Sequence, residues 1–254
     1  MTQHDSIGRY ATVALALAAV LLAGTAITLT VTSSDATAPT ATAGRGTAAA
    51  ASAAAAAPVV GPKPTAALPV PAALVDSTLS LRAGPVPVPL KLQIPSISVD
   101  IPVLGVGITA RNVMDAPEGP ENDPVWQQAF WYRGSAVPGA ASTALIAGHV
   151  DDPLGRPGAF AHIDLLRVGD LIVVHDARTG LDVRFSVTAA QTYSLAQAAD
   201  PAVLTQIYGA GPVDGNGPTP SADGLAHLTL ITCAGTFVNG THDHRIVVYA
   251  TRIA

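Results

Sequence analysis

The sequence predicts a mainly β domain from residue 89 to the C-terminus, and three observations support this. Short runs rich in Val, Ile, Thr and aromatic residues recur along this part of the chain. Gly, Pro, Asn and Asp separate the runs, which is typical of all-β barrels and sandwiches. Signals for helices are few, and the sequence contains no internal repeat and no phosphate-binding glycine motif. We therefore expect a single β-barrel or β-sandwich domain.

The expected elements follow from these runs in chain order. Strands are predicted at residues 91–94, 99–103, 129–132, 143–147, 171–175, 182–188, 228–232 and 246–251. A helix of about two turns is predicted at 158–166. A second short helix is predicted at 194–207, with a break near Pro201, because proline interrupts the helical hydrogen-bond pattern.

A predicted membrane anchor precedes this domain. After a short tail at residues 1–9, the segment 10–32 contains an uncharged apolar run. Its length of about 20 residues is what a transmembrane helix needs. The alternative is a cleaved signal peptide with its site at residues 41–43, but the apolar part of such peptides is usually only about 7 to 15 residues long. We favour a single-pass protein of the cell membrane with a cytoplasmic tail and an extracellular C-terminal domain.

Residues 33–88 have a different composition, dominated by Ala, Thr, Pro and Gly. Prolines at this density prevent a continuous helix or a central strand. We predict a disordered, extended stalk between the anchor and the domain.

Charge and cysteine content exclude some classes of function. The net charge is -5, and the sequence has no cluster of Lys and Arg, so a nucleic-acid partner is not expected. The single cysteine, Cys233, cannot form an internal disulfide. A free thiol in an exported chain therefore needs an explanation.

Cys233 ends the apolar run 228–232, and a polar turn is expected over residues 234–244 before the next strand. Free cysteines usually act as small buried hydrophobic residues. At the end of a strand, however, a thiol is expected to be partly exposed and open to partners that lower its pKa. Cys233 is therefore a candidate nucleophile.

Two residues complete a candidate catalytic set. His149 follows the strand 143–147 and is the best candidate proton carrier, with His242 and His244 as rivals because they lie near Cys233 in sequence. Arg245 opens the last strand on the face shared by Val247 and Tyr249, and its guanidinium can stabilise an oxyanion. A zinc site built from Cys233 and the nearby histidines is a weaker alternative, since neither paired cysteines nor a His-and-carboxylate motif is present.

These residues carry a resemblance to a known family. Residues 229–233, Thr-Leu-Ile-Thr-Cys, resemble the TLxTC signature of sortases, the cysteine transpeptidases of Gram-positive cell surfaces. Residues 147–151 resemble the segment around the sortase histidine, in the form seen in actinobacterial class F. Arg245 and its strand are similar to the sortase arginine strand, but in the form of other classes. The resemblance covers residues 89–254.

The resemblance implies a closed β-barrel with short helices and a catalytic set of His149, Cys233 and Arg245. The implied substrate is an LPXTG-like (Leu-Pro-x-Thr-Gly) sorting signal of an exported protein. The implied acceptor is an amine of peptidoglycan or of another surface protein, and no cofactor is expected. Thr232 and Ala234 flank the thiol and are expected to line the substrate pocket. Two alternatives remain, namely a hydrolytic cysteine peptidase and a non-catalytic surface-binding barrel.

Overall fold

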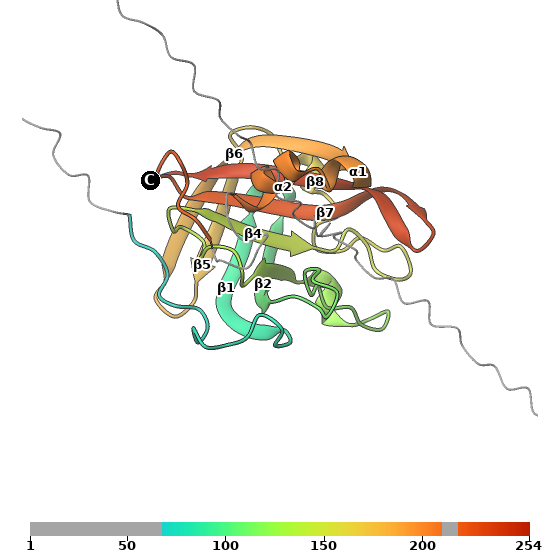
Figure 1. The fold of residues 1–254 in the computed structure, drawn as a ribbon, viewed down its shortest axis with the longest axis horizontal. Coiled ribbons are helices and arrows are strands. Elements are labelled where there is room, and N and C mark those ends of the chain that lie inside the picture. Colours follow the sequence, from blue (N-terminus) through green and yellow to red (C-terminus); the bar gives the residue numbers. More distant parts are fainter. Residues whose placement is uncertain (1–67, 210–217) are drawn as a thin grey trace, which may run out of the picture. The chain divides into compact units, whose positions relative to one another are not determined.

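The computed structural model describes residues 68–209 and 218–254. Within these residues, eight strands form a closed barrel in the order β1-β2-β3-β4-β7-β8-β6-β5 (Figure 1). The strands are β1 (Val86–Ile94), β2 (Val99–Val106), β3 (Ala129–Tyr132), β4 (Thr143–Gly148), β5 (Leu171–Asp176), β6 (Leu181–Ser194), β7 (His227–Val238) and β8 (Thr241–Arg252). The predicted mainly β fold, a closed barrel with few helices, is confirmed.

Two of the strand pairs are parallel and matter for the site. β2 pairs with β3, and β4 pairs with β7, in parallel, whereas the other neighbouring pairs of the barrel are antiparallel. A parallel pair needs a long crossover connection. The β4–β7 pairing therefore joins segments that lie far apart in the sequence.

The predicted polar turn over residues 234–244 is wrong. β7 and β8 instead continue as a long hairpin that turns only at Asn239 and Gly240. These residues have φ values of 53° and 84°, as a two-residue hairpin turn of type I′ requires, and Asn-Gly is its favoured sequence. Cys233 and Arg245 consequently lie inside a strand ladder rather than at strand ends.

Helical segments are short in the described residues. They are α1 (Leu195–Ala198), α2 (Pro201–Tyr208) and the 3-10 turns η1 (Pro95–Ile97), η2 (Pro124–Gln127) and η3 (Ile163–Leu165). Ser194 caps α1 through a capping box with Gln197, and the Asp200 side chain caps α2 just before Pro201. The predicted break near Pro201 is confirmed, whereas the predicted helix at 158–166 is reduced to η3.

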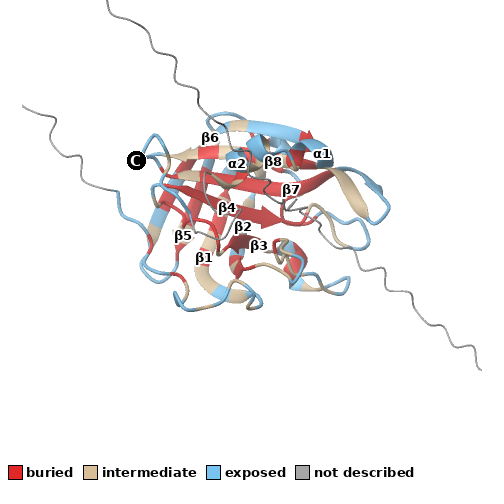
Figure 2. Ribbon diagram, in the orientation of Figure 1, coloured by how far each residue is buried: buried red, intermediate tan, exposed pale blue. Residues whose placement is uncertain are grey.

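The buried residues form two clusters on opposite faces of the barrel wall. The first fills the barrel interior with alternate residues of the strands, such as Leu228 and Leu230 of β7. The second lies on the outer face of β3, β4, β7 and β8, and includes Ile231, Val247 and Trp126 of η2. β4 is buried along its whole length because it has an apolar cluster on each side (Figure 2).

The chain contacts the barrel well before residue 89. Leu74 is buried in the interior cluster. The Arg178 guanidinium donates hydrogen bonds to the carbonyls of Ala72 and Ala73, at 3.2 and 3.1 Å. Arg133 binds the carbonyl of Ser80 in the same way. The folded domain therefore extends further toward the N-terminus than the composition indicates.

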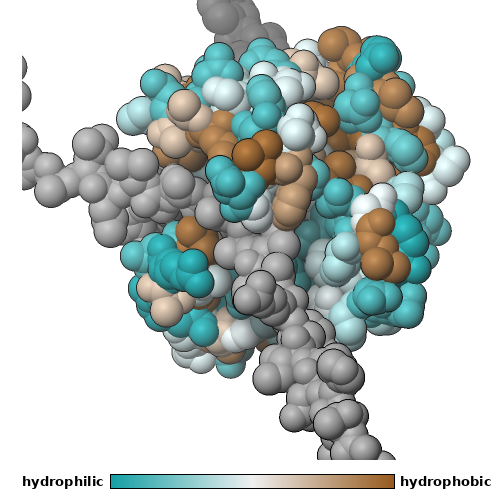
Figure 3. Space-filling view, turned by 90° about the vertical axis from the view of Figure 1, so that its right-hand side faces the viewer, coloured by the Kyte–Doolittle hydropathy of each residue, from teal (hydrophilic) through white to brown (hydrophobic). Residues whose placement is uncertain are grey.

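No helix in the described part of the chain is long and apolar enough to cross a membrane. The predicted anchor at residues 10–32 lies outside the described residues, as do the predicted tail and the stalk up to residue 67. On the face drawn in Figure 3, hydrophobic side chains occur in separate groups among hydrophilic ones.

Candidate functional site

The β7–β8 ladder brings Cys233 and Arg245 together. The two residues are directly paired in the antiparallel register. Side chains of such a pair lie on the same face, with Cβ atoms about 4.5 to 5.5 Å apart. Both are buried, with 6% and 2% of their surface exposed. The hairpin alone therefore places the Arg245 and Cys233 side chains next to each other on one face of the ladder.

The β4–β7 pairing adds His149 on the other side of Cys233. The last paired residues are Ala147 and Ile231, and His149 and Cys233 each lie two residues further along. The Thr232 hydroxyl continues this register by donating a hydrogen bond of 2.8 Å to the Gly148 carbonyl. Neighbouring strands are about 4.8 Å apart. His149, Cys233 and Arg245 thus form a row across β4, β7 and β8, which we call the strand row.

The strand row lies on the outer face of the barrel. Residues of a strand alternate between its two faces. Cys233 therefore shares a face with Ile231, and Arg245 shares one with Val247, and both of these belong to the outer cluster. The predicted face of Arg245 is confirmed.

Loops and aromatic rings hold His149 in place. Its Nε2–H donates a hydrogen bond of 2.9 Å to the Pro117 carbonyl. The rings of Trp126 and Phe130 lie 4.5 and 5.3 Å from the imidazole, centroid to centroid. Burial lowers the pKa of His149, and the bond to Pro117 and the charge of Asp151 only partly oppose this. At neutral pH the imidazole is therefore uncharged, and among the described residues its Nδ1 makes no hydrogen bond.

The resting thiol is also uncharged. Burial raises the pKa of Cys233 to about 11, although the positive charge of Arg245 acts in the opposite direction. The carboxylates of Asp151 and Glu118 raise the pKa further. The prediction of a partly exposed thiol with a lowered pKa is therefore wrong for the resting protein. An activated thiolate needs a base and a compensating positive charge, and the strand row supplies both.

Arg245 retains unused hydrogen-bonding capacity. Its Nη1 donates to the carbonyls of His242 and His244 at 3.0 and 2.7 Å. Its Nη2 is buried and has no hydrogen-bond partner among the described residues. A buried donor without a partner costs about 1 to 3 kcal/mol. Such a donor is available to an acceptor oxygen that enters the site.

The side chains of the rival histidines are hydrogen-bonded to aspartates rather than to the thiol. His242 Nε2 donates to Asp151 Oδ1 at 3.2 Å, and His244 Nδ1 donates to Asp243 Oδ1 at 2.7 Å. Neither is paired with Cys233 in the strand register. Within residues 68–209 and 218–254, no group of three or more His, Cys, Asp or Glu side chains is arranged to hold a metal ion.

The remaining predicted residues support the site from behind. Thr232 and Ala234 are buried and, by alternation, lie on the opposite face of β7 from Cys233. The Thr232 hydroxyl is hydrogen-bonded to the Gly148 carbonyl. A role of Thr232 or Ala234 in substrate binding stays a prediction. Gly148 is needed for packing, because a Cβ there would lie 2.6 Å from the Phe160 ring.

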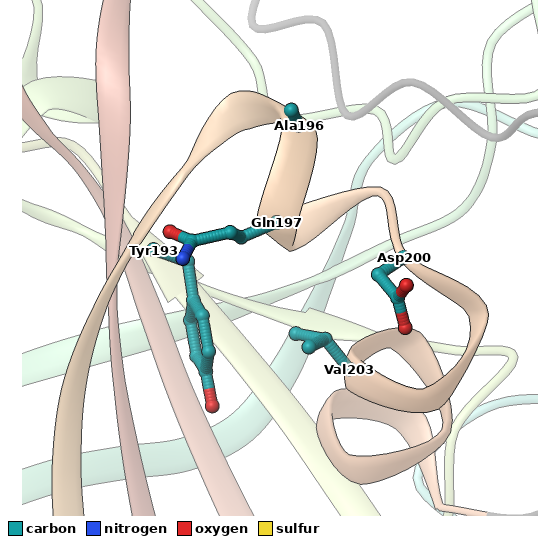
Figure 4. Close-up of a pocket in the computed structure, with 5 residues that line it drawn as sticks. All are labelled: Tyr193, Ala196, Gln197, Asp200 and Val203. Atoms are coloured by element: carbon teal, nitrogen blue, oxygen red, sulfur yellow. The ribbon is translucent and has the colours of Figure 1, made fainter.

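A fourth residue extends the strand row and was missed from the sequence. Tyr193 of β6 is paired with Arg245. It lines a pocket of about 360 Å³ together with Ala196, Gln197, Asp200 and Val203. Figure 4 shows the Val203 side chain of α2 pointing toward the ring of Tyr193, which comes from β6. The only sequence signal is that Tyr193 directly precedes the helix predicted at 194–207.

A family model described as the Sortase domain matches residues 92–253, more than half of the chain. Comparison with curated proteins gave no match.

Solved structures of sortases are among the matches. Sortase A from Corynebacterium diphtheriae is 21% identical, covers 66% of this chain and 61% of its own, and has a TM-score of 0.44. Sortase C-1 from Actinomyces oris is 21% identical, covers 65% of this chain and 71% of its own, and has a TM-score of 0.42. This chain thus spans less than two thirds of the Corynebacterium protein. Its class within the family stays a prediction. By the match of the domain model, the chain belongs to the sortase family of cysteine transpeptidases.

Proposed function

We propose that this sortase is a membrane-anchored transpeptidase that cleaves an LPXTG-like sorting signal and joins the acyl group to an amine of the cell envelope. The strand row is the observation that carries the proposal. It aligns a thiol, an imidazole and a guanidinium with an unused donor on one face of three neighbouring strands. Acyl transfer through a thioester needs a nucleophile, a proton carrier and an oxyanion donor, and these three groups can supply them.

The first half of the reaction forms the acyl-enzyme. The Cys233 sulfur attacks the carbonyl carbon of the signal's threonine, and its proton passes to His149. The oxyanion that develops accepts a hydrogen bond from Nη2 of Arg245, which is already desolvated. When the tetrahedral intermediate collapses, the imidazolium protonates the leaving glycine amine, so that the thioester remains on Cys233.

The second half reverses these steps with a new amine. The incoming amine attacks the thioester carbonyl, and His149 accepts its proton. The sulfur then leaves as a thiolate beside Arg245 and recovers a proton from His149. The burial of Cys233 and His149 restricts access of water and so supports transfer to an amine over hydrolysis.

The pocket beside Tyr193 suits the apolar part of the sorting signal. It lies at the Arg245 end of the strand row and is lined partly by Tyr193, Ala196 and Val203. A small pocket with apolar walls and a few polar groups is typical of a side-chain binding site. We assign this pocket to the leucine of the signal.

The membrane part of the proposal rests on the sequence alone. The uncharged run within residues 10–32 has the length of a transmembrane helix. If it is an uncleaved anchor, the full-length chain stays in the membrane fraction after alkaline carbonate washing. Protease added to intact cells would then remove the C-terminal domain. Release of a shortened chain into the medium would show a cleaved signal peptide instead.

The central test is amide exchange. The full-length chain is incubated with an LPXTG-type peptide and diglycine, or with a diaminopimelate-type mimic of a cross-bridge, and the products are measured by mass. We expect a joined product with the wild type and none with Cys233→Ala or His149→Ala. Full exchange by Cys233→Ala would exclude the mechanism. An active His149→Ala together with an inactive His244→Ala would reassign the histidine.

A further inference from the structure

We propose that His242 is a positioning residue, which acts through a hydrogen bond to Asp151 to fix the His149 side of the site relative to Arg245. The inference rests on the proposed function, because it concerns the geometry of the same reaction. His242 itself is given no part in bond making or proton transfer.

The contact joins the two sides of the strand row. His242 lies in β8, three residues before Arg245, whereas Asp151 lies two residues after His149. The His242 Nε2–H donates to Asp151 Oδ1 at 3.2 Å, and a carboxylate at that position can only accept. The backbone carbonyl of His242 accepts a hydrogen bond of 3.0 Å from Nη1 of Arg245. One residue therefore contacts both the guanidinium and the loop that follows His149.

Burial and an aromatic contact hold the His242 side chain in place. Only 13% of it is exposed, and the Phe237 ring packs edge-on against it at 5.2 Å. Among the described residues its Nδ1 is buried without a hydrogen-bond partner, so the bond to Asp151 is its only polar side-chain contact. Asp151 is fixed in turn by a β-bridge to Pro157.

The hairpin needs such a link at this point. The β7–β8 register shifts between Ala234 and Phe237, one residue pair beyond Cys233 and Arg245. Gly235 has a φ of 79°, which is consistent with a bulge there. A bulge bends the strand and interrupts its ladder, so regular pairing alone does not fix the hairpin tip above the site. The hydrogen bond between His242 and Asp151 instead ties the hairpin to the loop that follows His149.

The link also bears on the charge beside the thiol. The carboxylate of Asp151 opposes formation of the Cys233 thiolate. A hydrogen bond from His242 takes up part of the negative charge on that carboxylate. Loss of His242 should therefore slow reactions of the thiol even when no substrate is present.

The test compares His242→Ala with three matched variants of the full-length chain. His242→Gln keeps an N–H donor near the position of Nε2, and Asp151→Ala removes the acceptor. His244→Ala is the control, because His244 also binds an aspartate but only its own neighbour, Asp243. Each variant is assayed for amide exchange, for thermal unfolding and for the rate of Cys233 alkylation by iodoacetamide.

We expect His242→Ala to lower kcat roughly tenfold to hundredfold with little change in KM, because the reacting groups are misplaced. His242→Gln should recover most of this loss, and His244→Ala should behave as wild type. The double variant His242→Ala with Asp151→Ala should lose no more exchange than the worse single variant. Alkylation of Cys233 should slow severalfold in His242→Ala and recover when Asp151→Ala is added.

Two results would overturn the inference. One is an unchanged kcat and alkylation rate in His242→Ala, and the other is an equal loss in His244→Ala. If wild type shows no exchange with any peptide, the proposed function fails. The alkylation rates still decide the role of His242 in that case, because they need no substrate.

Discussion

The two halves of the site are held by different means. Cys233 and Arg245 are positioned by the β7–β8 ladder, so their separation is set by backbone hydrogen bonds. His149 lies just past the end of β4 and depends on the Pro117 carbonyl, the Trp126 ring and the register continued by Thr232. A ladder is rigid, whereas loop contacts are easily lost. Backbone pairing therefore fixes Cys233 and Arg245, which we call the ladder half of the site. His149, the loop half, is positioned by tertiary contacts that single mutations can remove.

The largest expected effect tests the ladder half. Arg245→Ala removes the only guanidinium paired with the thiol in the described structure and should lower kcat about 100- to 1000-fold, as the loss of an oxyanion donor does elsewhere. Arg245→Lys keeps the charge but not the geometry of several donors, so it should recover only part of the loss. The check is steady-state exchange kinetics. Full recovery by lysine would show that charge alone matters.

The next effect concerns the thiol as a function of pH. With the pKa of Cys233 raised to about 11, the rate of iodoacetamide alkylation should keep rising above pH 9, by roughly tenfold per pH unit. An unperturbed thiol would level off near pH 8.5. Arg245→Ala removes a charge that lowers this pKa, so its curve should shift to higher pH, whereas Asp151→Asn should shift it to lower pH. A plateau below pH 9 in the wild type would contradict the burial effect.

A smaller effect is expected in the loop half. Trp126→Phe keeps a ring beside His149 but removes the indole N–H that donates to the Pro120 carbonyl at 2.9 Å. This bond ties Trp126 to the loop that carries Pro117. We expect kcat to fall about tenfold through misplacement of His149, with a stability loss of about 1 kcal/mol. Unchanged alkylation of Cys233 in the same variant would confirm that the ladder half is unaffected.

The smallest effect tests the junction of the two halves. Thr232→Val keeps the shape of the side chain but removes the hydroxyl that donates to the Gly148 carbonyl. The buried carbonyl then lacks this partner, at a cost of about 1 to 3 kcal/mol in the free energy of unfolding. Urea denaturation measures this cost. A stable Thr232→Val variant with wild-type exchange would show that strand pairing alone sets the position of His149.

The same division explains what the sequence predicts. Alternating and β-branched runs are typical of partly buried strands, so they predict all eight strands, and the TLxTC-like segment indicates Cys233. The Asn239-Gly240 turn carries a known hairpin signal, yet the polar composition around it favours a loop, which would place Cys233 at a strand end. The hydrogen bond from His149 to the Pro117 carbonyl and the one from His242 to Asp151 both join residues far apart in sequence. Such contacts leave no local pattern, and neither does the desolvation that raises the thiol pKa.

The most direct measurement of the central claim is the mass of the intact chain after incubation with an LPXTG-type peptide and no amine acceptor. The account predicts an adduct equal to the acyl part of the peptide, attached to Cys233 and released as an amide when diglycine is added. An unmodified chain, or the same adduct on the Cys233→Ala variant, would contradict it.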